Sequence, residues 1–270
     1  MYEPKVSIIL TTYNSLKNLE QTYSSITTYN SLKNLEQTYS SITTQDYNNI
    51  EIVVVDGGST DGTIERLKEY EKIIKYNIHW ISEPDNGIYD AMNKGLKIAT
   101  GDLLLFFNDI FSSSSVIRML VSAVNKNKNC IGAHGDLLYC QNGKIKRQWK
   151  MGNGNIEEGW MPAHPTLLLH REIFNVYGGF KTDYKCAADY EFMVRILKNN
   201  TNKLAYVPEV LVYMFYGGTS SNGIKAYCIS FFEASRALKE NGISRPYLVS
   251  LKRTLKVLRQ FLNVNIFKKL

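Results

Sequence analysis

Short apolar runs and longer amphipathic stretches alternate along the first half of this chain. Each apolar run is five to seven residues long and rich in aliphatic side chains, which is typical of buried strands. The strands are expected at residues 5–10, 50–56, 78–82 and 102–107. Between them, residues 62–74 and 88–99 carry apolar side chains at helical spacing. Strands that alternate with helices predict an α/β fold with a mostly parallel central sheet.

The second half shows a pattern in which strands pair with their neighbours. Residues 112–127 predict a helix, and alternating runs at 131–140 and 144–149 flank Gln-Asn-Gly, which favours a hairpin. Residues 151–165 are polar and glycine-rich, and they are long enough to form a lid or an acceptor-binding loop. Strands at 166–170 and 203–216, a helix from residue 186 and a helix over 224–241 complete the prediction.

An internal repeat interrupts the first half, because residues 11–26 recur unchanged as residues 27–42. One copy suffices for a strand end and a helix from Ser15. A shift of sixteen residues turns the apolar face of a helix by about 160°, so one copy is surplus. We expect the first Thr-Thr-Tyr-Asn to follow the first strand, with the surplus bulging out or lengthening the helix. The alternative is a slipped register with residues 27–30 in that place.

Charge is concentrated at the C-terminal end. Of the net charge of +7, all is accounted for by residues 242–270, which hold seven basic and no acidic side chains. A neutral body argues against nucleic acid as a partner, and the basic tail favours an anionic surface. On a helix, five leucines of this tail fall within an arc of about 80°. Either these leucines pack on the body, or residues 248–270 lie on an anionic membrane. The leucines are Leu248, Leu251, Leu255, Leu258 and Leu262.

The expected location of the protein rests on the absence of an apolar membrane span and of a signal peptide in the sequence. No apolar run reaches the roughly 18 residues of a membrane span, and the N-terminal residues do not resemble a signal peptide. The four cysteines are scattered without a Cys-x-x-Cys pair, which predicts reduced thiols rather than a metal site. We expect a cytoplasmic protein, peripheral on the inner face of the plasma membrane if the tail binds lipid. Residues 1–241 are expected to form one domain, followed by the tail.

The second strand ends in a turn that suits a nucleotide. Asp56 is followed by Gly-Gly-Ser-Thr-Asp-Gly and then by a helix. Glycines let the backbone approach a ligand, and a new helix offers unpaired N–H groups to a phosphate. Asp56 can accept hydrogen bonds from a base or a sugar. The structural alternative is a tight turn with Asp61 as a helix cap.

Several motifs in order resemble family 2 glycosyltransferases of the GT-A fold. They include Val-Ser-Ile-Ile-Leu-Thr-Thr-Tyr-Asn, Val-Val-Val-Asp-Gly-Gly-Ser-Thr-Asp-Gly-Thr and Pro-Asp-Asn-Gly-Ile-Tyr-Asp-Ala-Met-Asn-Lys-Gly. The others are Gly101-Asp102 leading to Asn108-Asp109, His164-Pro-Thr, Ala188-Asp-Tyr-Glu and Gly217-Gly-Thr-Ser. The resemblance covers residues 5–241. It implies a Rossmann-like, mostly parallel sheet flanked by helices, a small antiparallel acceptor-side part and a C-terminal helical tail.

The resemblance also implies an activity. It predicts transfer of a sugar, with inversion, from a nucleotide-diphosphate donor to a glycan or lipid-linked acceptor in cell-surface polysaccharide synthesis, with Mg²⁺ or Mn²⁺. Residues 1–110 would bind the donor, and residues 111–241 would bind the acceptor. The nucleotide-sugar contacts would be Thr11, Tyr13, Asn14, Asp56, Gly58, Asp90, Asn93, Lys94 and Asn108. Asp109 would bind the metal, Asp189 would be the catalytic base, and His164, Glu191 and Arg195 would contact the acceptor or a phosphate.

Elementary chemistry supports two of these roles. A hard cation on carboxylate oxygen suits a leaving diphosphate, and an acceptor hydroxyl needs a base within hydrogen-bond reach. For Asp189 the structural alternative is an acid favoured by the dipole of its helix.

The sequence departs from the family at the metal site, because Asn108-Asp109 holds one carboxylate where the family commonly has Asp-x-Asp. The metal site is then weak, completed by the donor phosphates, or absent. An impaired sugar-nucleotide-binding protein is the alternative function. A nucleotidyltransferase is a third alternative, but no basic triphosphate loop lies near the N-terminus.

Overall fold

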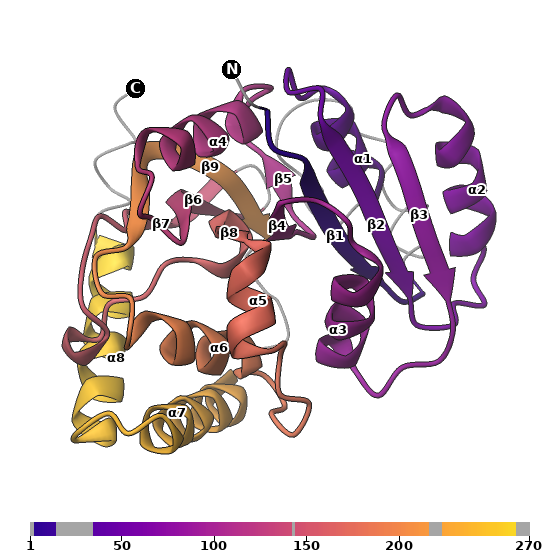
Figure 1. The fold of residues 1–270 in the computed structure, drawn as a ribbon. Coiled ribbons are helices and arrows are strands. Elements are labelled where there is room, and N and C mark those ends of the chain that lie inside the picture. Colours follow the sequence, from indigo (N-terminus) through magenta and orange to yellow (C-terminus); the bar gives the residue numbers. More distant parts are fainter. Residues whose placement is uncertain (1–2, 15–34, 142–143, 216–222, 263–270) are drawn as a thin grey trace.

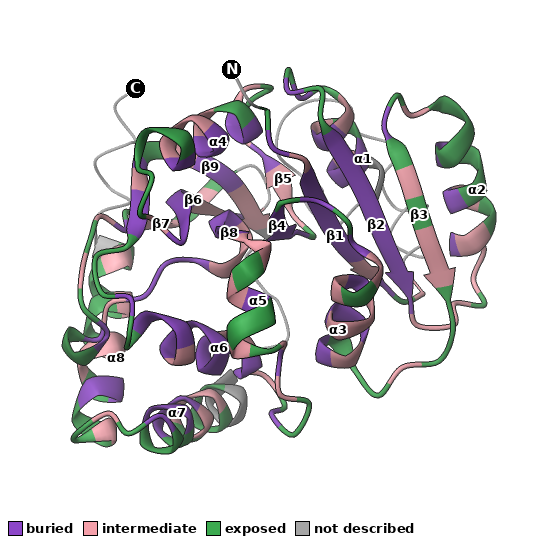
Figure 2. Cartoon of the chain, in the orientation of Figure 1, coloured by how far each residue is buried: buried purple, intermediate pink, exposed green. Residues whose placement is uncertain are grey.

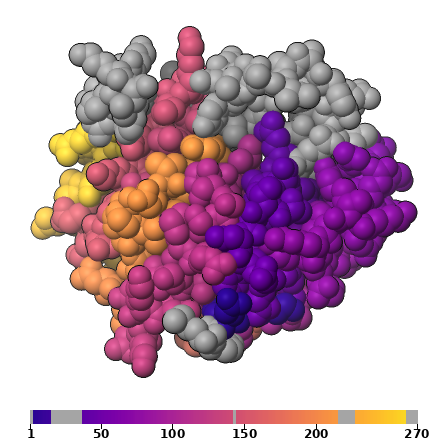
Figure 3. Space-filling model, turned by 90° about the horizontal axis from the view of Figure 1, so that it is seen from above, coloured from indigo at the N-terminus to yellow at the C-terminus, as the bar shows by residue number. Residues whose placement is uncertain are grey.

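One mixed sheet forms the centre of the molecule (Figure 1). The computed structural model describes residues 3–14, 35–141, 144–215 and 223–262. Within these ranges the sheet has nine strands in the order β3-β2-β1-β4-β8-β6-β9-β5, and β7 pairs with β6. In the view from above, the first half, in indigo and purple, adjoins the second half, in magenta to orange (Figure 3). The expected α/β class and flanking helices are confirmed.

Four parallel strands carry the first half of the site. They are β1 (Val6–Thr12), β2 (Ile50–Asp56), β3 (Asn77–Ser82) and β4 (Leu103–Phe106), and β1 lies between β2 and β4. The register pairs Thr12 with Asp56, so the residues that follow β1 and β2 emerge at the same edge. The helices of this half are α1 (Leu35–Thr43), α2 (Thr63–Ile73) and α3 (Ile88–Ile98).

The second half continues the same sheet with mixed strand directions. Antiparallel pairs join β4 to β8 and β8 to β6, whereas β6 and β9 run parallel. The predicted hairpin is confirmed as the antiparallel pair β6–β7. The strands are β5 (Ile110–Phe111), β6 (Gly132–Gln141), β7 (Lys144–Trp149), β8 (Leu168–His170) and β9 (Leu204–Phe215). The helices are α4 (Val116–Lys126), α5 (Arg171–Tyr177), α6 (Ala188–Leu197), α7 (Gly223–Glu240) and α8 (Pro246–Leu262).

The strand pattern builds a core on both faces of the sheet. In β1, Val6, Ile8 and Leu10 belong to one buried cluster and Ile9 to the other, because successive side chains point to opposite faces. Buried residues accordingly run the whole length of β2 (Figure 2). The continuous apolar runs therefore mark strands that are covered on both sides.

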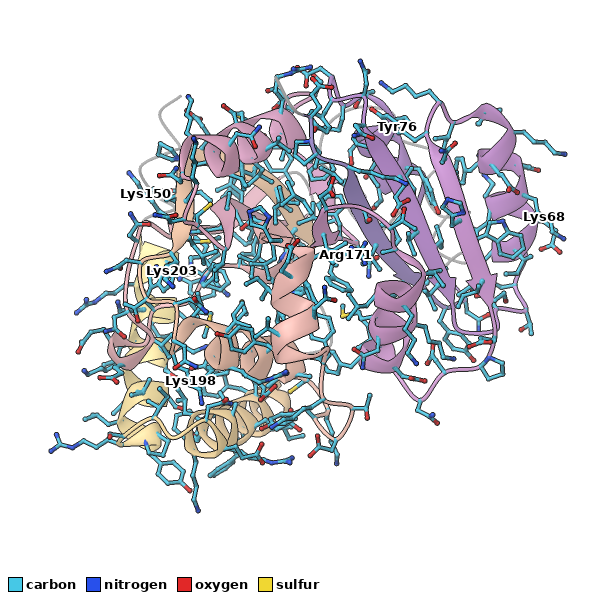
Figure 4. The ribbon with its side chains drawn as sticks, viewed as in Figure 1. Lys68, Tyr76, Lys150, Arg171, Lys198 and Lys203 are labelled. Carbon is cyan, nitrogen blue, oxygen red and sulfur yellow. The ribbon has the colours of Figure 1, made fainter. Side chains whose placement is uncertain are left out.

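Two segments differ from their predictions. Residues 151–165 are not a free loop, because Met151, Ile156, Met161 and Ala163 are all buried. The segment contains two short 3₁₀ turns, η3 (Ile156–Glu158) and η4 (His164–Thr166). Helix α5 was not predicted; it begins where the main-chain N–H of Arg171 donates to the carbonyl of Asp102. Arg171 lies near the centre of Figure 4, and its Nε donates to the carbonyl of Gly101 at 2.7 Å.

The described part of the repeat uses one copy at each end. Thr11 and Thr12 of the first copy end β1, and Tyr13 and Asn14 follow it, so the first copy adjoins the first strand as expected. Most of helix α1 is formed by the second copy. The expected position of the surplus lies outside the described residues. Residues 216–222, which include the Gly217-Gly-Thr-Ser motif, also lie outside the described residues, as does the side chain of Leu262.

Candidate active site

Asp56 organises the turn at the carboxyl end of β2. Its carboxylate is fully buried and accepts from the main-chain N–H groups of Gly58, at 3.0 Å, and Ser59, at 2.8 Å. The hydroxyls of Ser59 and Ser82 also donate to it. Gly58 has φ +85°, a left-handed conformation that favours glycine. The expected turn is therefore present. Asp61 accepts from the main-chain N–H of Thr63 at 3.2 Å, but the N-cap of α2 is Gly62, so Asp61 lies one residue before the cap and is not the N-cap itself.

Residues after β1 close the other side of this turn. The main-chain N–H of Asn14 donates to Ser59 Oγ at 2.8 Å, and Asn14 Oδ1 accepts from the N–H of Thr60 at 3.0 Å. Tyr13 lies alongside Gly57 with 63% of its side chain exposed. The structure thus brings Tyr13, Asn14 and the Asp56 turn together, which leaves an exposed aromatic ring for a ligand to stack on.

The carboxyl ends of β1 and β4 are linked by a pair of hydrogen bonds. Asn108 Oδ1 accepts from the N–H of Thr11 at 3.0 Å, and Asn108 Nδ2 donates to Thr11 Oγ1 at 2.8 Å. This link places Asp109, the next residue, at the edge of the sheet shared with Asp56.

Lys94 anchors the loop between β3 and α3. Its ammonium lies 2.9 Å from a carboxylate oxygen of Glu83 and 3.8 Å from one of Asp90, and it donates to the carbonyl of Pro84. The hydrogen bond with Glu83 raises the pKa of Lys94. Asp90 in turn accepts from the N–H of Asn86 at 3.0 Å. Lys94 and Asp90 therefore already have hydrogen-bond or ion-pair partners within the protein, and their contacts with the donor stay predictions.

Asn93 connects the two halves of the molecule. Its Nδ2 donates to the carbonyl of Phe180 at 2.7 Å, and its Oδ1 accepts from the N–H of Phe180 at 2.8 Å. Phe180 packs edge-on against Phe106 of β4 and against His164. Both polar ends of the amide thus contact the backbone of Phe180, and the expected diphosphate contact stays a prediction.

Asp189 occupies the second position of α6 and is half-buried. The hydroxyl of Tyr89, on α3, donates to its Oδ1 at 3.3 Å. Burial and the nearby Asp189 charge raise the pKa of Tyr89, so this hydroxyl stays protonated and remains a donor. Glu233 of α7 accepts from the N–H groups of residues 185–187. Glu233 thus supplies the acidic contact to the main-chain N–H groups just before α6, which Asp189 does not.

Tyr139 is a half-buried phenol whose pKa is influenced by charges from both halves of the molecule. Burial raises the pKa of Tyr139; Arg147 and Arg253 lower it, and the charges of Asp109 and Asp189 raise it. The guanidinium of Arg147 lies 4.3 Å from the centre of the Tyr139 ring. The structure therefore packs Arg147 on the Tyr139 ring, and the charges of Asp109, Asp189 and Arg253 act on its hydroxyl from further away.

The surroundings of Asp109 suit a divalent cation. Burial raises the pKa of this carboxyl to about 7, and no described residue donates a hydrogen bond to it. A carboxylate in this state is stabilised by a cation, which fits a metal. Among the described residues, no group of three His, Cys, Asp or Glu side chains is arranged to hold a metal. Within these ranges a metal at Asp109 would therefore need ligands other than a cluster of three such side chains.

His164 lies close to Asp189 with its ring unsatisfied. Both ring nitrogens are buried without a hydrogen-bond partner in the described structure. Burial lowers its pKa, and the Asp189 charge opposes that shift. A neutral imidazole with free nitrogens next to the candidate base suits a contact with a substrate hydroxyl or phosphate.

Glu191 and Arg195 have structural roles instead of the expected acceptor contacts. Glu191 is fully buried and lies 2.7 Å from Arg195 and 3.1 Å from Lys181. Nδ2 of Asn241 also donates to it at 3.1 Å. The guanidinium of Arg195 donates to backbone carbonyls of residues 177 and 179. These contacts occupy both charged groups inside the protein.

Three residues at the site were not identified from sequence. Tyr89 lies in the Ile-Tyr-Asp-Ala-Met motif, directly before Asp90, and this position was the available signal. Tyr139 lies on the predicted hairpin. Arg253 comes from α8, and its guanidinium lies 4.5 Å from the centre of the Tyr190 ring. No local pattern announces a contact between helices this far apart in sequence.

The solved structures that resemble this chain are sugar-nucleotide enzymes. A mannosyltransferase from Pyrobaculum calidifontis, in complex with GDP-Man and Mn²⁺, superposes with a TM-score of 0.61 and 18% identity, covering 95% of this chain and 70% of that one. TarS from S. aureus in complex with UDP-GlcNAc gives a TM-score of 0.60 and 19% identity, covering 97% of this chain and 72% of TarS. These likenesses establish the GT-A fold.

Sequence relatives are glycosyltransferases. An uncharacterized glycosyltransferase of Mycobacterium tuberculosis is 31% identical over 213 residues, 71% of this chain and 68% of the relative. A PGL/p-HBAD biosynthesis glycosyltransferase of Mycobacterium bovis is 26% identical over 82% of this chain and 81% of its own length. An uncharacterized glycosyltransferase of Haemophilus influenzae is 28% identical over 98% of this chain and 80% of its own.

The family match and the structure use different copies of the repeat. Residues 25–181 match glycosyl transferase family 2, so the match takes in residues 27–30 of the second copy. In the structure the first copy follows β1, because that register buries Ile8, Ile9 and Leu10. A slip of sixteen residues would put serines in place of both isoleucines. Since the match spans more than half of the chain, the chain belongs to glycosyl transferase family 2.

Proposed function

We propose that this chain transfers a hexosyl unit from a nucleotide-diphosphate sugar to a glycan or lipid-linked acceptor, with inversion, in the synthesis of a cell-surface glycan. The observation that carries the proposal is the contact between Tyr89 and Asp189, which holds a carboxylate towards the donor-side helix α3. The complexes of similar structures with GDP-Man and UDP-GlcNAc support the donor class. The relative named for PGL/p-HBAD biosynthesis supports the acceptor class.

The residues of the chain divide the chemistry as follows. Asp189 takes the proton of the acceptor hydroxyl while the hydroxyl oxygen bonds to the anomeric carbon of the sugar. The bond from that carbon to the diphosphate breaks, and its electron pair leaves with the nucleoside diphosphate. Tyr89 donates to Oδ1 of Asp189, so Oδ2 is free to face the acceptor. Attack from the side opposite the leaving group inverts the anomeric configuration.

The donor lies at the carboxyl ends of β1, β2 and β4 in this proposal. The ring of Tyr13 stacks on the base, and Thr11, Asn14 and the Gly58 turn line the nucleotide pocket. Asp109 would hold Mg²⁺ or Mn²⁺, with the donor phosphates as the remaining ligands. When bound, the ion would neutralise charge on the leaving diphosphate. The half-buried carboxylate of Asp109, which accepts no hydrogen bond from a described residue, supports this assignment.

A donor screen followed by a transfer assay tests the proposal. Thermal unfolding with UDP-, GDP- and dTDP-sugars, with and without Mn²⁺, identifies the donor, because a ligand of the native state raises the melting temperature. Asp189→Asn is expected to keep donor binding and to lower the transfer rate by about 10²-fold to 10⁴-fold. Asp183→Asn is the control, since Asp183 is an exposed carboxylate just before the same helix. Equal rates for Asp189→Asn and the control would contradict the assignment of the base.

The second candidate function is a sugar-nucleotide-binding protein that has lost turnover. It is favoured by the single carboxylate, Asp109, found at the expected metal site within the described structure. Binding of a donor without hydrolysis or transfer, at saturating Mn²⁺, would support it. Hydrolysis of the donor that depends on Asp189 would exclude it.

A further inference from the structure

Helix α8 is fixed to the protein by one of its faces. Val249 and Ser250 are buried, and Ser250 Oγ lies 2.8 Å from Oγ of Ser235 on α7. Gly159 lies directly beneath the helix: a Cβ there would come within 2.4 Å of the backbone nitrogen of Arg253. Near the end of the helix, Nε of Arg147 donates to Oε1 of Gln260 at 2.5 Å. These contacts set the rotation of α8 about its axis.

The opposite face of α8 is apolar and open. Leu248, Leu251, Leu255 and Leu258 are 44%, 48%, 50% and 57% exposed. The residues that pack inward lie about half a turn away from these leucines at 100° per residue. The alternative in which these four leucines pack on the body is therefore wrong. An ordered row of half-exposed leucines on one helix needs a partner.

Positive charge borders the leucine row on one side. Lys256 and Arg259 are exposed, and no described residue forms an ion pair with either. Lys252, on the same border, is paired with Glu158 at 3.0 Å. The helix carries no acidic residue, and the sequence adds Lys268 and Lys269 after it. The other border carries Tyr247, which is 62% exposed. Leucines flanked by cations and a tyrosine match a helix lying in a membrane interface.

We propose that α8 docks this protein on an anionic lipid surface, with the leucine row in the acyl boundary and Lys256 and Arg259 at the headgroups. This inference goes beyond transfer activity, because it concerns the surface on the far side of α8 from Tyr190. A second copy of the chain is a poorer partner, since pairing two such faces would bring like charges together. The described residues contain no helix that is both long and apolar enough to cross a bilayer, so contact along one face is the geometry considered.

Vesicle sedimentation of the full chain tests the proposal. The protein is incubated with vesicles of phosphatidylcholine alone or mixed with phosphatidylglycerol, at low and high salt. Removal of α8 is unsuitable, because it would also remove the buried Val249 and Ser250 and would uncover Ser235 of α7, which Ser250 contacts. The leucine variant is Leu251→Gln with Leu255→Gln, and the charge variant is Lys256→Gln with Arg259→Gln. The matched controls are Ile73→Gln with Val176→Gln, both 74% exposed elsewhere, and Lys68→Gln with Lys72→Gln on α2. Lys68 projects away from the body in Figure 4.

The expected result is binding to the anionic vesicles that weakens with salt. The leucine variant should bind at least about tenfold more weakly, because the glutamine side chains bury less apolar area in the lipid than the leucines would. The charge variant should lose roughly tenfold on anionic vesicles and little on neutral ones. Both controls should bind as the unaltered chain does. Circular dichroism melts check that each variant is folded.

Two results would overturn the proposal. One is equal sedimentation of the folded leucine variant and the unaltered chain. The other is leucine-dependent dimer formation in light scattering without vesicle binding, which would make a second copy the partner. Neither result bears on donor binding or transfer, so failure here is distinguishable from failure of the proposed function.

Discussion

The hydroxyl of Tyr89 on α3 and the carboxylate of Asp189 on α6 lie 3.3 Å apart, joining two helices that are separated by 100 residues in the sequence. Helix α3 follows the donor-side strand β3, and α6 belongs to the acceptor half. A phenol that cannot ionise near neutral pH is a steady donor to a carboxylate. The contact therefore holds one oxygen of Asp189, and in the proposed mechanism the other oxygen faces the acceptor.

Tyr89→Phe removes this contact and should lower kcat by about tenfold with little change in KM for the donor, because the loss falls on orientation of the base. Steady-state transfer kinetics measure both constants. The control is Tyr76→Phe, on the other side of the sheet, where the hydroxyl contacts the carbonyls of Gln45 and Tyr47 at 2.9 Å each. Tyr76 is labelled in Figure 4. If both variants lost kcat equally, positioning by Tyr89 would be refuted.

Asn93→Ala should lower the free energy of unfolding by about 1–3 kcal/mol, because it leaves the N–H and the carbonyl of Phe180 without their partners. Chemical denaturation measures this change. Asn86→Ala is the matched control, since Asn86 is exposed just before α3. A variant as stable as the control, but weaker in donor binding, would return Asn93 to the diphosphate contact expected from the sequence.

His134 predicts a pH dependence of stability. It is fully buried, and burial lowers its pKa to about 4. Below pH 6.5 the unfolded chain takes up a proton that the folded protein accepts only near pH 4. The free energy of unfolding should therefore fall by roughly 3 kcal/mol between pH 6.5 and pH 4 on account of this residue.

His134→Phe should remove that slope, because phenylalanine does not titrate and fits beside Trp160 and Tyr206, the rings that His134 contacts. It also removes two buried nitrogens that have no partner within the described structure. Unfolding curves at several pH values give the slope. His79→Gln is the control, since His79 is exposed. An unchanged slope in His134→Phe would show that other groups dominate the acid sensitivity.

Deleting one copy of the repeat should leave the fold intact. Removal of residues 11–26 or 27–42 yields the same sequence, and the connection between β1 and α1 becomes sixteen residues shorter. A shorter connection costs less closure entropy, so the free energy of unfolding should stay equal or rise by about 1 kcal/mol. Thermal unfolding and donor binding of the deletion test this. A deletion variant that fails to fold would show that both copies are structural.

The sequence predicts the strand ends well because their pattern is local. A β-branched run that stops at Asp56, or an apolar run that stops at Asn108-Asp109, fixes both the strand and the edge at which the polar residue emerges. The parallel order then brings these ends together. The same reasoning predicts the hairpin from Gln-Asn-Gly, because two-residue turns have strict residue preferences.

Roles that depend on distant partners are not readable in this way. The amide of Asn93 suits a phosphate or a backbone equally, and its partner Phe180 is 87 residues away. The spacing of Glu191 and Arg195 allows an ion pair on a helix, but only tertiary packing shows that Glu191 is buried. For α8 the pattern identifies the leucine row correctly, yet cannot decide which way the row faces.

Strand β4 pairs with β1 on one side and with β8 on the other, so the donor and acceptor halves are cut from one sheet. A hinge motion that separated the two halves would break the hydrogen bonds between these strands. If Asp189 is the base, this continuous sheet sets its distance from a donor bound at the carboxyl ends of β1, β2 and β4. We therefore expect transfer to be limited by the size of the sugar, because the acceptor hydroxyl has to reach the anomeric carbon across a distance that the protein does not adjust.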